Sequence, residues 1–320
     1  MLNKFVRVTL DDYLEFVSNT KKIRIGNEEI ELTPVKVRRT APTAEELTDV
    51  TTTVWSFPKR GGWATHRGNY RGNFAPQIPR AVISRYSREG ETVLDPMVGS
   101  GTTCIEAKLL GRKCIGVDVN YKSVMLSLHR LYWLEQSVLT GDVKMNSQEL
   151  ERFAKAQVEF YVGNAGELSW IDDESIDLVI THPPYFNIIK YGTENPHDLS
   201  QARNLKEYLL GLRSVGEEIY RVMKRGKAFG ILIGDTREKK HYVPITAYVL
   251  MEMLSLGYVL REEIVKVQHK MKTTREIWSK RERDFLLIYH EKLYILEKSE
   301  DSGEYKNSSG IFLKSLKELI

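Results

Sequence analysis

The sequence has very little cysteine, no long apolar run and only a small excess of one charge. Its two cysteines, Cys104 and Cys114, exclude a disulfide-rich scaffold and a four-cysteine zinc site, and they favour a reducing compartment. No apolar run reaches the roughly 18 residues that a membrane-spanning helix needs. An acidic pair, Asp11 and Asp12, stands where a signal peptide would need an apolar stretch. We therefore expect a soluble protein of the cytoplasm.

The formal net charge of +4 fits an anionic partner only weakly, because a dense positive surface would need many more basic residues. Hydrophobic residues make up 42% of the 320 positions, enough for one large α/β domain with an extension. Lysine and glutamate are frequent and glutamine is rare, a bias that hints at a thermophile. Apart from His182, the histidines show no spacing typical of metal ligands, so we expect no metal site.

The pattern divides the chain into three parts. Residues 1–55 form a small mixed segment, in which KIRIG and EEIEL, joined by Gly26 and Asn27, indicate a β-hairpin. Residues 56–75 are glycine-rich, basic and aromatic without a strong period, which predicts a loop. Its aromatic side chains either pack on the main domain or form, with the basic ones, a surface on which bases stack and phosphates pair. Both interpretations stay open.

In residues 76–320 short apolar runs alternate with amphipathic segments. This alternation predicts an α/β fold with a mostly parallel sheet that helices cover on both faces. A well-patterned helix is expected over 205–223, with Gly226 as its C-terminal glycine cap. The last strand is expected within FLLIYHEKLYIL.

A glycine turn follows the first strand of this pattern, in VLDPMVGSGTT. Gly99 and Gly101 let the backbone turn tightly and approach a ligand, and the helix after them offers free N–H groups. The second strand ends at Asp118, whose carboxylate can accept hydrogen bonds from both hydroxyls of a ribose. Asp95, beside the turn, suits an ammonium group and would repel a diphosphate.

Four interpretations of this turn compete. A triphosphate loop needs a lysine after the second glycine, where Thr102 and Thr103 stand. A dinucleotide-binding site requires a third glycine near position 104, where this chain has Cys104. A turn without any ligand would leave Asp118 unexplained. S-adenosylmethionine, which carries an ammonium, a carboxylate and a ribose, fits the residues best.

A second motif, Thr-His-Pro-Pro-Tyr, follows the strand over 176–180, the fourth in the pattern. The end of that strand should lie at the same carboxyl edge as the glycine turn. Pro183 and Pro184 fix φ and remove two N–H donors, so the carbonyls of His182 and Pro183 can point rigidly into a cleft as acceptors. Tyr185 adds a face on which a ring can stack.

The pair DPMVGSGTT and THPPY resembles the amino-methyltransferase family that modifies N4 of cytosine or N6 of adenine in nucleic acids. The resemblance covers residues 73–292 and implies a Rossmann-like, seven-stranded class I methyltransferase sheet with S-adenosylmethionine as cofactor. It implies cofactor contacts from Phe74, Asp95, Pro96, Gly99, Ser100, Gly101, Thr102, Thr103, Asp118 and Asn164. It places the catalytic tetrapeptide at His182, Pro183, Pro184 and Tyr185, and makes residues 76–320 the catalytic domain.

The first residue of that tetrapeptide bears on the target base. In this family it is usually serine in cytosine N4 enzymes and aspartate or asparagine in adenine N6 enzymes, whereas this chain has His182. Because a carboxylate suits an adenine amine, its absence favours cytosine. Acceptors that hold the amine N–H bonds out of the ring plane would make the nitrogen more nucleophilic, and Tyr185 would stack on the flipped base.

Several side chains have two interpretations. His182 either accepts the departing proton or only supplies a hydrogen bond, and Asp235 either supports the site or caps a helix. Transfer from a sulfonium needs no covalent intermediate, so Cys104 and Cys114 are expected as core residues. His129, in an apolar helix, is expected to be a satisfied core or surface residue.

For the substrate, structured RNA such as ribosomal RNA is favoured, because no large sequence-reading insert is evident. Duplex DNA, as in restriction–modification systems, stays open. The basic stretch 268–284 either contacts phosphates or is an ordinary charged connection. Two further alternatives are a cofactor-binding subunit that needs a partner, against which the intact motifs argue, and a methyltransferase for small-molecule or protein amines, against which the basic aromatic loop argues.

Overall fold

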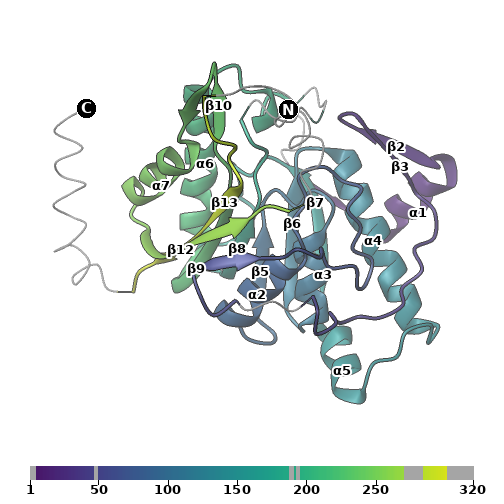
Figure 1. Ribbon diagram of the computed structural model, residues 1–320. Coiled ribbons are helices and arrows are strands. Elements are labelled where there is room, and N and C mark those ends of the chain that lie inside the picture. The colour runs from purple at the N-terminus through teal and green to yellow at the C-terminus, as the bar shows by residue number, and fades with distance from the viewer. Residues whose placement is uncertain (1–4, 47–49, 187–190, 192–194, 270–283, 301–320) are drawn as a thin grey trace.

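The structure is a computed structural model that describes residues 5–46, 50–186, 191, 195–269 and 284–300. Its main strands are β1 (Phe5–Val8), β4 (Val54–Ser56), β5 (Thr92–Asp95), β6 (Lys113–Asp118), β7 (Val158–Gly163), β8 (Ile176–Thr181), β9 (Met223–Ile233), β12 (Val259–Val267) and β13 (His290–Lys298). They form one nine-stranded sheet in the order β1-β7-β6-β5-β8-β9-β13-β12-β4 (Figure 1).

Seven of these strands make the expected Rossmann-like class I methyltransferase sheet. β7, β6, β5, β8 and β9 are parallel to one another, and β13 lies antiparallel between β9 and β12. Along the chain, β5 is followed by β6 and β7, which lie on one side of it in the sheet, and then by β8 and β9, which lie on its other side. In such sheets ligands bind beyond the carboxyl ends of the strands, where the strand order reverses. That point lies next to β5.

The N-terminal segment adds a strand to each edge of the sheet. β1 pairs antiparallel with β7, and β4 pairs parallel with β12. The boundary expected between residues 55 and 56 therefore falls inside β4. The hairpin is confirmed, because β2 (Lys22–Ile25) and β3 (Glu28–Glu31) pair antiparallel.

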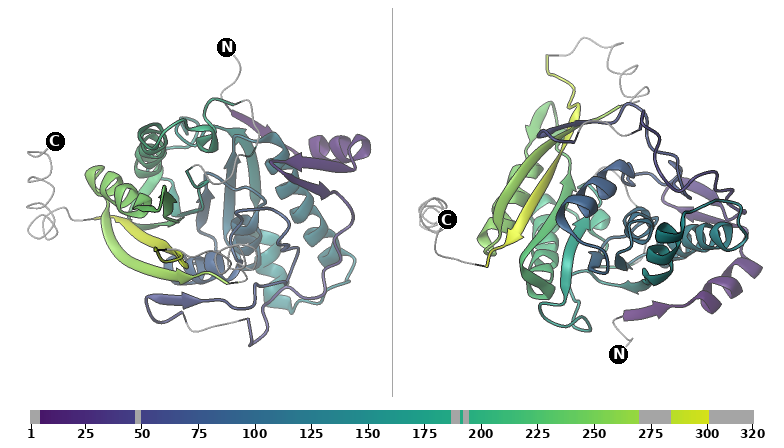
Figure 2. Two further views of the ribbon diagram at one scale, coloured as in Figure 1. Left: turned by 45° about the horizontal axis from the view of Figure 1, so that its top comes forward. Right: turned by 90° about the horizontal axis from the view of Figure 1, so that it is seen from below.

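Helices cover both faces of the sheet. α2 (Gln77–Tyr86), α3 (Thr102–Leu109) and α4 (Tyr121–Leu139) pack on one face, and α6 (Leu205–Val222) and α7 (Ile245–Ser255) pack on the other (Figure 1). The smaller elements are α1 (Leu10–Asn19), α5 (Ser147–Lys155), a short 3₁₀ helix (Leu199–Gln201), β10 (Thr236–Glu238) and β11 (His241–Val243). Figure 2 shows α1 and the hairpin, in purple, at one end of the sheet and β13, in yellow, at the other. No helix in the described part of the chain has both the length and the apolar character needed to cross a membrane.

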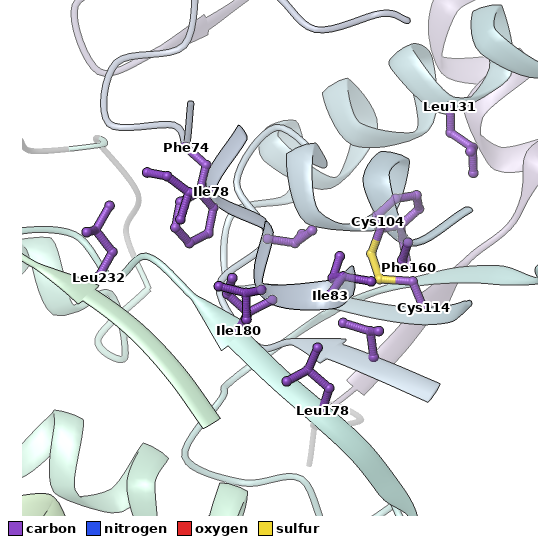
Figure 3. Packing of buried hydrophobic residues seen from close by; sticks show 14 of the residues in the cluster. Phe74, Ile78, Ile83, Cys104, Cys114, Leu131, Phe160, Leu178, Ile180 and Leu232 are labelled. Carbon is purple, nitrogen blue, oxygen red and sulfur yellow. A yellow bond between two sulfur atoms is a disulfide. The ribbon is translucent and has the colours of Figure 1, made fainter. Parts of the chain in front are cut away.

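A hydrophobic core lies on each face of the sheet, the first under α2, α3 and α4 and the second under α6 and α7. Both follow from the alternation of side chains along strands such as β8, all six residues of which are buried. Leu178 and Ile180 pack with α2, including Ile78, whereas Val179 packs under α6 (Figure 3). Continuous apolar strands of this kind are typical of parallel sheets that are covered on both faces.

Cys104 of α3 and Cys114 of β6 are buried in the first core, as expected. A disulfide bond joins them (Figure 3), which the sequence analysis did not predict. α3 packs directly on β6, and this packing brings the two side chains together although each lies in a different element.

The helix expected over 205–223 is confirmed as α6, but its expected glycine cap is wrong. α6 ends with Met223 as its C-cap, and the chain passes straight into β9, so Gly226 with its φ of +70° lies inside a strand and is not a helix cap. The final strand, β13, begins at His290, within the expected run, and ends two residues beyond that run, at Lys298.

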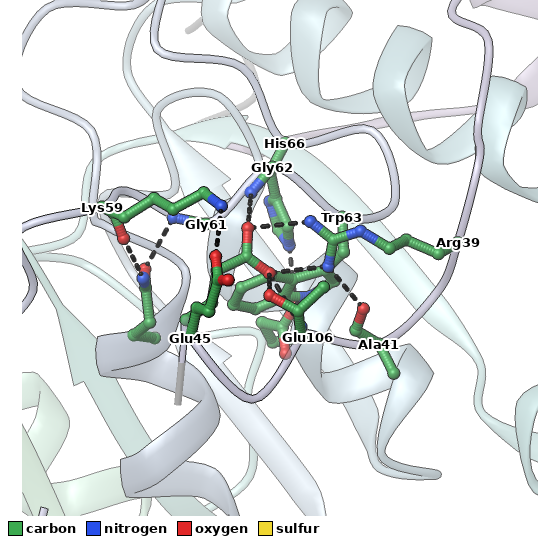
Figure 4. A network of polar contacts seen from close by, with 12 residues as sticks. Arg39, Ala41, Glu45, Lys59, Gly61, Gly62, Trp63, His66 and Glu106 are labelled. Atoms are coloured by element: carbon green, nitrogen blue, oxygen red, sulfur yellow. Dashed lines mark hydrogen bonds and ion pairs between the residues drawn. The ribbon is translucent and has the colours of Figure 1, made fainter. Parts of the chain in front are cut away.

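The loop over 56–75 packs into the molecule through its aromatic side chains. Phe57, Trp63, Tyr70 and Phe74 are all buried, so the interpretation of these rings as an open base-stacking surface is wrong. Buried Glu106 of α3 anchors the loop by accepting hydrogen bonds from Trp63 Nε1 at 2.6 Å and Arg80 at 2.9 Å, and it lies 2.6 Å from His66 (Figure 4). This anchorage fixes the loop beside the helix that follows the glycine turn.

Candidate active site

Two adjoining hollows lie at the carboxyl edge of the parallel strands. The first hollow, of about 380 Å³, is lined by the glycine turn, the end of β6 and residues 164–166 and 196–202. The second hollow, of about 230 Å³, is lined by His182, Pro183 and Tyr185 and by side chains from β12 and β13. Five residues line both hollows: Gly72, Asn73, Phe74, His182 and Tyr191. The two predicted motifs therefore meet at a shared wall.

The glycine turn has the backbone that its sequence predicts. Gly99 and Gly101 have φ of +54° and +82°, values that other residues rarely adopt. A Cβ on Gly101 would also lie 3.0 Å from the Cβ of Ser127. Ser127 donates a 3.0 Å hydrogen bond to the Gly99 carbonyl, and Arg130 donates to Ser100 Oγ at 2.7 Å. α4 therefore holds the turn from behind.

Two of the carboxylates that line the first hollow, those of Asp95 and Asp118, lie beside the glycine turn. Asp95 accepts hydrogen bonds from Thr181 Oγ1 at 3.0 Å and from the Met97 N–H at 3.2 Å. Asp118 accepts from the N–H groups of Gly99 and Asn120, both at 2.9 Å. Burial raises the pKa of Asp95 to about 6 and that of Asp118 to about 7, because the ionised forms lose hydration.

Most of the predicted cofactor residues line the first hollow. They are Phe74, Asp95, Pro96, Gly99, Ser100, Thr102, Asp118 and Asn164. Gly101 and Thr103 do not line it: Gly101 is the N-cap of α3 and packs on Ser127. Tyr191 and Asp198 also line this hollow, although no motif in the sequence predicted them.

The Thr-His-Pro-Pro-Tyr motif connects the two hollows. Thr181, its first residue, donates to Asp95, while His182 Nε2 lies 2.7 Å from the Tyr185 hydroxyl. Tyr185 in turn donates a 2.6 Å hydrogen bond to Glu291 Oε1. The Pro184 carbonyl is already engaged, because it accepts from the Tyr208 hydroxyl at 2.8 Å.

These contacts fix the tautomer of His182. Since Tyr185 donates its one hydroxyl proton to Glu291, it can only accept from His182, and so Nε2 carries the imidazole proton. Nδ1 is then a lone-pair acceptor, and it is buried without a hydrogen-bond partner. Burial lowers the pKa of His182 to about 4, so the ring is neutral at neutral pH.

Tyr185 is held firmly in the wall of the second hollow. A Cβ on Gly234 would lie 2.9 Å from its ring, so the glycine at the end of β9 makes room for it. Burial and the neighbouring Glu291 both raise the pKa of the Tyr185 hydroxyl, which therefore stays protonated. The ring of His182 packs 5.0 Å from that of Phe74, between the hollows.

Other predicted residues have structural roles. Asp235 accepts hydrogen bonds from the N–H and the hydroxyl of Thr246 in the first turn of α7, so the helix-cap interpretation is confirmed. His129 contacts the Tyr13 hydroxyl and the Thr33 carbonyl and is a satisfied, buried residue. Within the basic stretch 268–284, residues 270–283 lie outside the described residues.

Three charged residues of the second hollow were not predicted from the sequence: Arg60, Lys266 and Glu291. Lys266 and Glu291 lie in strands that hold several other charged residues, VLREEIVKV and HEKLYILEK, so their charge alone gave no signal. Arg60 belongs to the loop that was noted as basic and aromatic, but nothing in the sequence connects it with the Pro-Pro-Tyr motif.

The strand order and the paired hollows define a class I methyltransferase fold. The chain belongs to the DNA methylase family, whose model matches residues 4–127 and 176–317. The model of an RMKL-like methyltransferase domain matches residues 69–203.

Curated relatives include RNA and DNA enzymes. A tRNA (guanine(10)-N2)-dimethyltransferase of Methanocaldococcus jannaschii is 32% identical over 36% of this chain and 29% of the relative. The type II methyltransferase M.ScaI of Streptomyces caespitosus is 34% identical over 27% of this chain and 30% of the relative. The chain thus spans about 30% of the length of these relatives. The structure of TrmN from Thermus thermophilus covers 71% of this chain and 50% of its own, with 19% identity and a TM-score of 0.42.

The first hollow fits S-adenosylmethionine, the cofactor that membership of this family implies. Its volume of about 380 Å³ lies in the range of sites for ligands of this size. Asp95 can hold the ammonium group and Asp118 the ribose hydroxyls. Thr102 Oγ1, which also lines the hollow, is buried without a hydrogen-bond partner and is free to contact the ligand.

Proposed function

We propose that this chain is an S-adenosylmethionine-dependent methyltransferase that methylates an exocyclic base amine in nucleic acid, namely N4 of cytosine, with structured RNA favoured over DNA. The observation that carries the proposal is the shared wall of the two hollows, where Phe74 and His182 line both. A methyl donor in the first hollow and a base in the second would meet across this wall.

The cofactor supplies an activated methyl group on sulfur, so the protein's part is to bind, orient and desolvate the amine. His182 Nδ1 is a buried acceptor that lacks a partner, and it stands at the first position of the motif. An amine that donates one N–H to Nδ1 would have its lone pair turned towards the first hollow. This acceptor replaces the serine, aspartate or asparagine that related enzymes carry at this position.

The second hollow also offers a rigid ring for stacking. Tyr185 is fixed by its hydrogen bonds to His182 and Glu291 and by its packing on Gly234. Base–aromatic stacking contributes about 1–3 kcal/mol per base. A base that has been flipped or splayed out of its helix could therefore be held between this ring and the hollow's apolar side.

The choice of RNA rests on two considerations. Relatives whose names specify tRNA or ribosomal RNA match this chain, among them one described as a ribosomal RNA large subunit methyltransferase, 31% identical over 42% of this chain. A structured RNA can present a splayed base by its shape, without a large sequence-reading domain. Duplex DNA is the second candidate, because the matching family model describes a DNA methylase.

The test is incubation of the protein with methyl-labelled cofactor and separate pools of unmodified ribosomal RNA and genomic DNA, followed by nucleoside mass spectrometry. We expect label in N4-methylcytidine from the RNA pool. Label in DNA alone would reverse the substrate preference. Label only in N6-methyladenine or N2-methylguanine would contradict the choice of base.

A Tyr185→Ala variant serves as the control in each pool. It should lose transfer but retain cofactor binding, because Tyr185 does not line the first hollow. Wild-type protein that binds the cofactor and labels neither pool would favour a cofactor-binding subunit or an enzyme for other amines.

A further inference from the structure

The second hollow carries a charged pair that the geometry of the sheet brings together. Lys266 of β12 and Glu291 of β13 are direct partners in the antiparallel register. Lys266 Nζ lies 2.7 Å from Glu291 Oε2, and their side chains are only 17% and 9% exposed. Direct cross-strand neighbours of opposite charge hold one another in place. The pair is therefore a fixed feature of the wall.

Both carboxylate oxygens of Glu291 are already engaged by neighbouring side chains. One oxygen accepts from Tyr185 and the other from Lys266. Although burial alone would raise its pKa, the charge of Lys266 holds the pKa of Glu291 below its usual value, and the group is ionised. Glu291 is thus a positioning residue that orients a ring on one side and an ammonium on the other.

Lys266 retains donors that the pair does not use. An ammonium group has three N–H bonds, and Glu291 takes one of them. Arg60 supplies a second cation in the same wall, since it also lines the second hollow. Arg60 donates through Nη2 to the Phe74 carbonyl, whereas its Nε is buried without a hydrogen-bond partner.

Both cations line the hollow together with His182. Lys266 is connected to the imidazole by hydrogen bonds through Glu291 and Tyr185. Arg60 donates to the carbonyl of Phe74, whose ring packs 5.0 Å from the imidazole. The wall around His182 therefore combines one acceptor, Nδ1, with two cationic donor groups.

We infer that Lys266 and Arg60 read the acceptor edge of the target base, the ring nitrogen and carbonyl oxygen that follow the amine of a cytosine. This inference rests on the proposed function and explains its choice of base. Cytosine presents, in order, an N–H₂ donor, the N3 acceptor and the O2 acceptor. His182 Nδ1 would take the donor, and the two cations would donate to the two acceptors.

Other bases match this arrangement less well. Adenine presents its amine and one ring acceptor, followed by a C–H group that cannot accept. Guanine presents an N–H donor beside its amine, which would face a cation. A phosphate in the hollow would be placed beside the ionised carboxylate of Glu291, whereas a neutral base would not be repelled by it.

The test compares Lys266→Met, Lys266→Arg and the double variant Lys266→Met/Glu291→Gln with the wild type. The double variant removes the ammonium without leaving an unpaired buried carboxylate. Lys292→Met is the matched control: it removes a lysine from the next position of β13, on the opposite face, where Lys292 pairs with Glu263. Transfer of label to ribosomal RNA transcripts gives kcat and KM, and calorimetry gives the cofactor affinity.

We expect kcat/KM to fall about 10- to 100-fold in Lys266→Met and in the double variant, the size of one lost hydrogen bond from a charged donor. Lys266→Arg should regain part of this loss, and cofactor affinity should change less than about twofold in every variant. Arg60→Met should also lower kcat/KM with RNA. Lys292→Met should behave as the wild type.

Two results would overturn the inference in different ways. If the wild type forms N4-methylcytidine and the folded double variant does so within threefold of the wild-type kcat/KM, the base-reading role is wrong and the proposed function stands. If the wild type forms no N4-methylcytidine, the proposed function fails and the inference fails with it. The product formed by the wild type distinguishes the two cases.

Discussion

The two adjoining hollows differ in the charge of their walls. The first is bordered by the carboxylates of Asp95 and Asp118, whereas the second has Lys266 and Arg60 around a single carboxylate, Glu291. An acidic wall suits a ligand with an ammonium and a sulfonium. A wall with spare cationic donors suits a neutral group rich in acceptors. The difference is what the proposed function requires, since a methyl donor and a base are partners of unlike chemistry that would meet at Phe74 and His182.

The hollows also differ in how their polar groups are held. Burial raises the pKa values of Asp95 and Asp118, because their ionised forms lose hydration. In the second hollow, His182, Tyr185, Glu291 and Lys266 form a continuous chain of hydrogen bonds. The carboxylates of the first hollow can therefore pair with a positively charged ligand. In the second hollow the polar side chains already bond to one another, which leaves Nδ1 of His182 and the remaining N–H groups of the two cations for a ligand.

The largest effect is expected at Tyr185, which lines the second hollow but not the first. Tyr185→Ala removes the stacking ring and the hydrogen bond that fixes the His182 tautomer, and should lower kcat at least 100-fold. Tyr185→Phe keeps the ring and should lose less, about tenfold. Single-turnover methyl transfer measures both. Full turnover of Tyr185→Ala would refute the stacking role.

A smaller effect is expected when the first hollow loses a carboxylate. Asp118→Asn should weaken binding of S-adenosylmethionine about 30-fold, because the ribose hydroxyls lose a charged acceptor. Binding of nucleic acid should be unaffected, since Asp118 does not line the second hollow. Calorimetry with each ligand tests this separation. Equal losses for both ligands would mean that the hollows are not independent.

The pH dependence of cofactor binding should report the raised pKa values. Burial raises the pKa of Asp95 to about 6 and that of Asp118 to about 7. The ligand is held by the ionised forms, so binding releases protons, and affinity should increase as pH rises through this window. We expect roughly tenfold weaker binding at about pH 6.2 than at about pH 8, and a larger loss below that. A flat profile in titrations at several pH values would contradict the assignment.

The smallest effect is expected at Asn164. Its side chain lines the first hollow, but its Oδ1 already accepts a 2.9 Å hydrogen bond from the Gly166 N–H. Asn164→Ala should weaken cofactor binding about threefold to fivefold, in keeping with the loss of one neutral hydrogen bond. If Asn164→Ala lost as much affinity as Asp118→Asn, the adenine end of the ligand would matter more than the ribose.

Part of the first hollow could be predicted from sequence because its glycine turn and Asp118 are local, whereas Tyr191 and Asp198, which come from later in the chain, could not. Gly99, Gly101 and Asp118 belong to one strand–helix–strand unit, and the backbone of that unit follows from glycine chemistry. The second hollow could be predicted only in part. His182 and Tyr185 lie in a motif, but Lys266 and Glu291 come from two later strands whose pairing register no local pattern specifies.

The incorrect expectations have the same physical origin. Gly226 follows a helix with basic residues, a pattern typical of a C-terminal cap, yet the chain passes directly into β9 because the strand is needed beside β8. The aromatic rings of the 56–75 loop resembled a binding surface, but buried Glu106 anchors that loop and its rings fill the core. Tertiary packing decided both cases.

The central claim is that a methyl donor in the first hollow faces a base in the second across the wall of Phe74 and His182. The most direct measurement is a crystal structure with sinefungin, in which an amine replaces the transferable methyl group. We predict that this amine points to the shared wall, with the ammonium at Asp95 and the ribose at Asp118. An amine that faces away from His182, or a ligand bound outside the first hollow, would contradict the account.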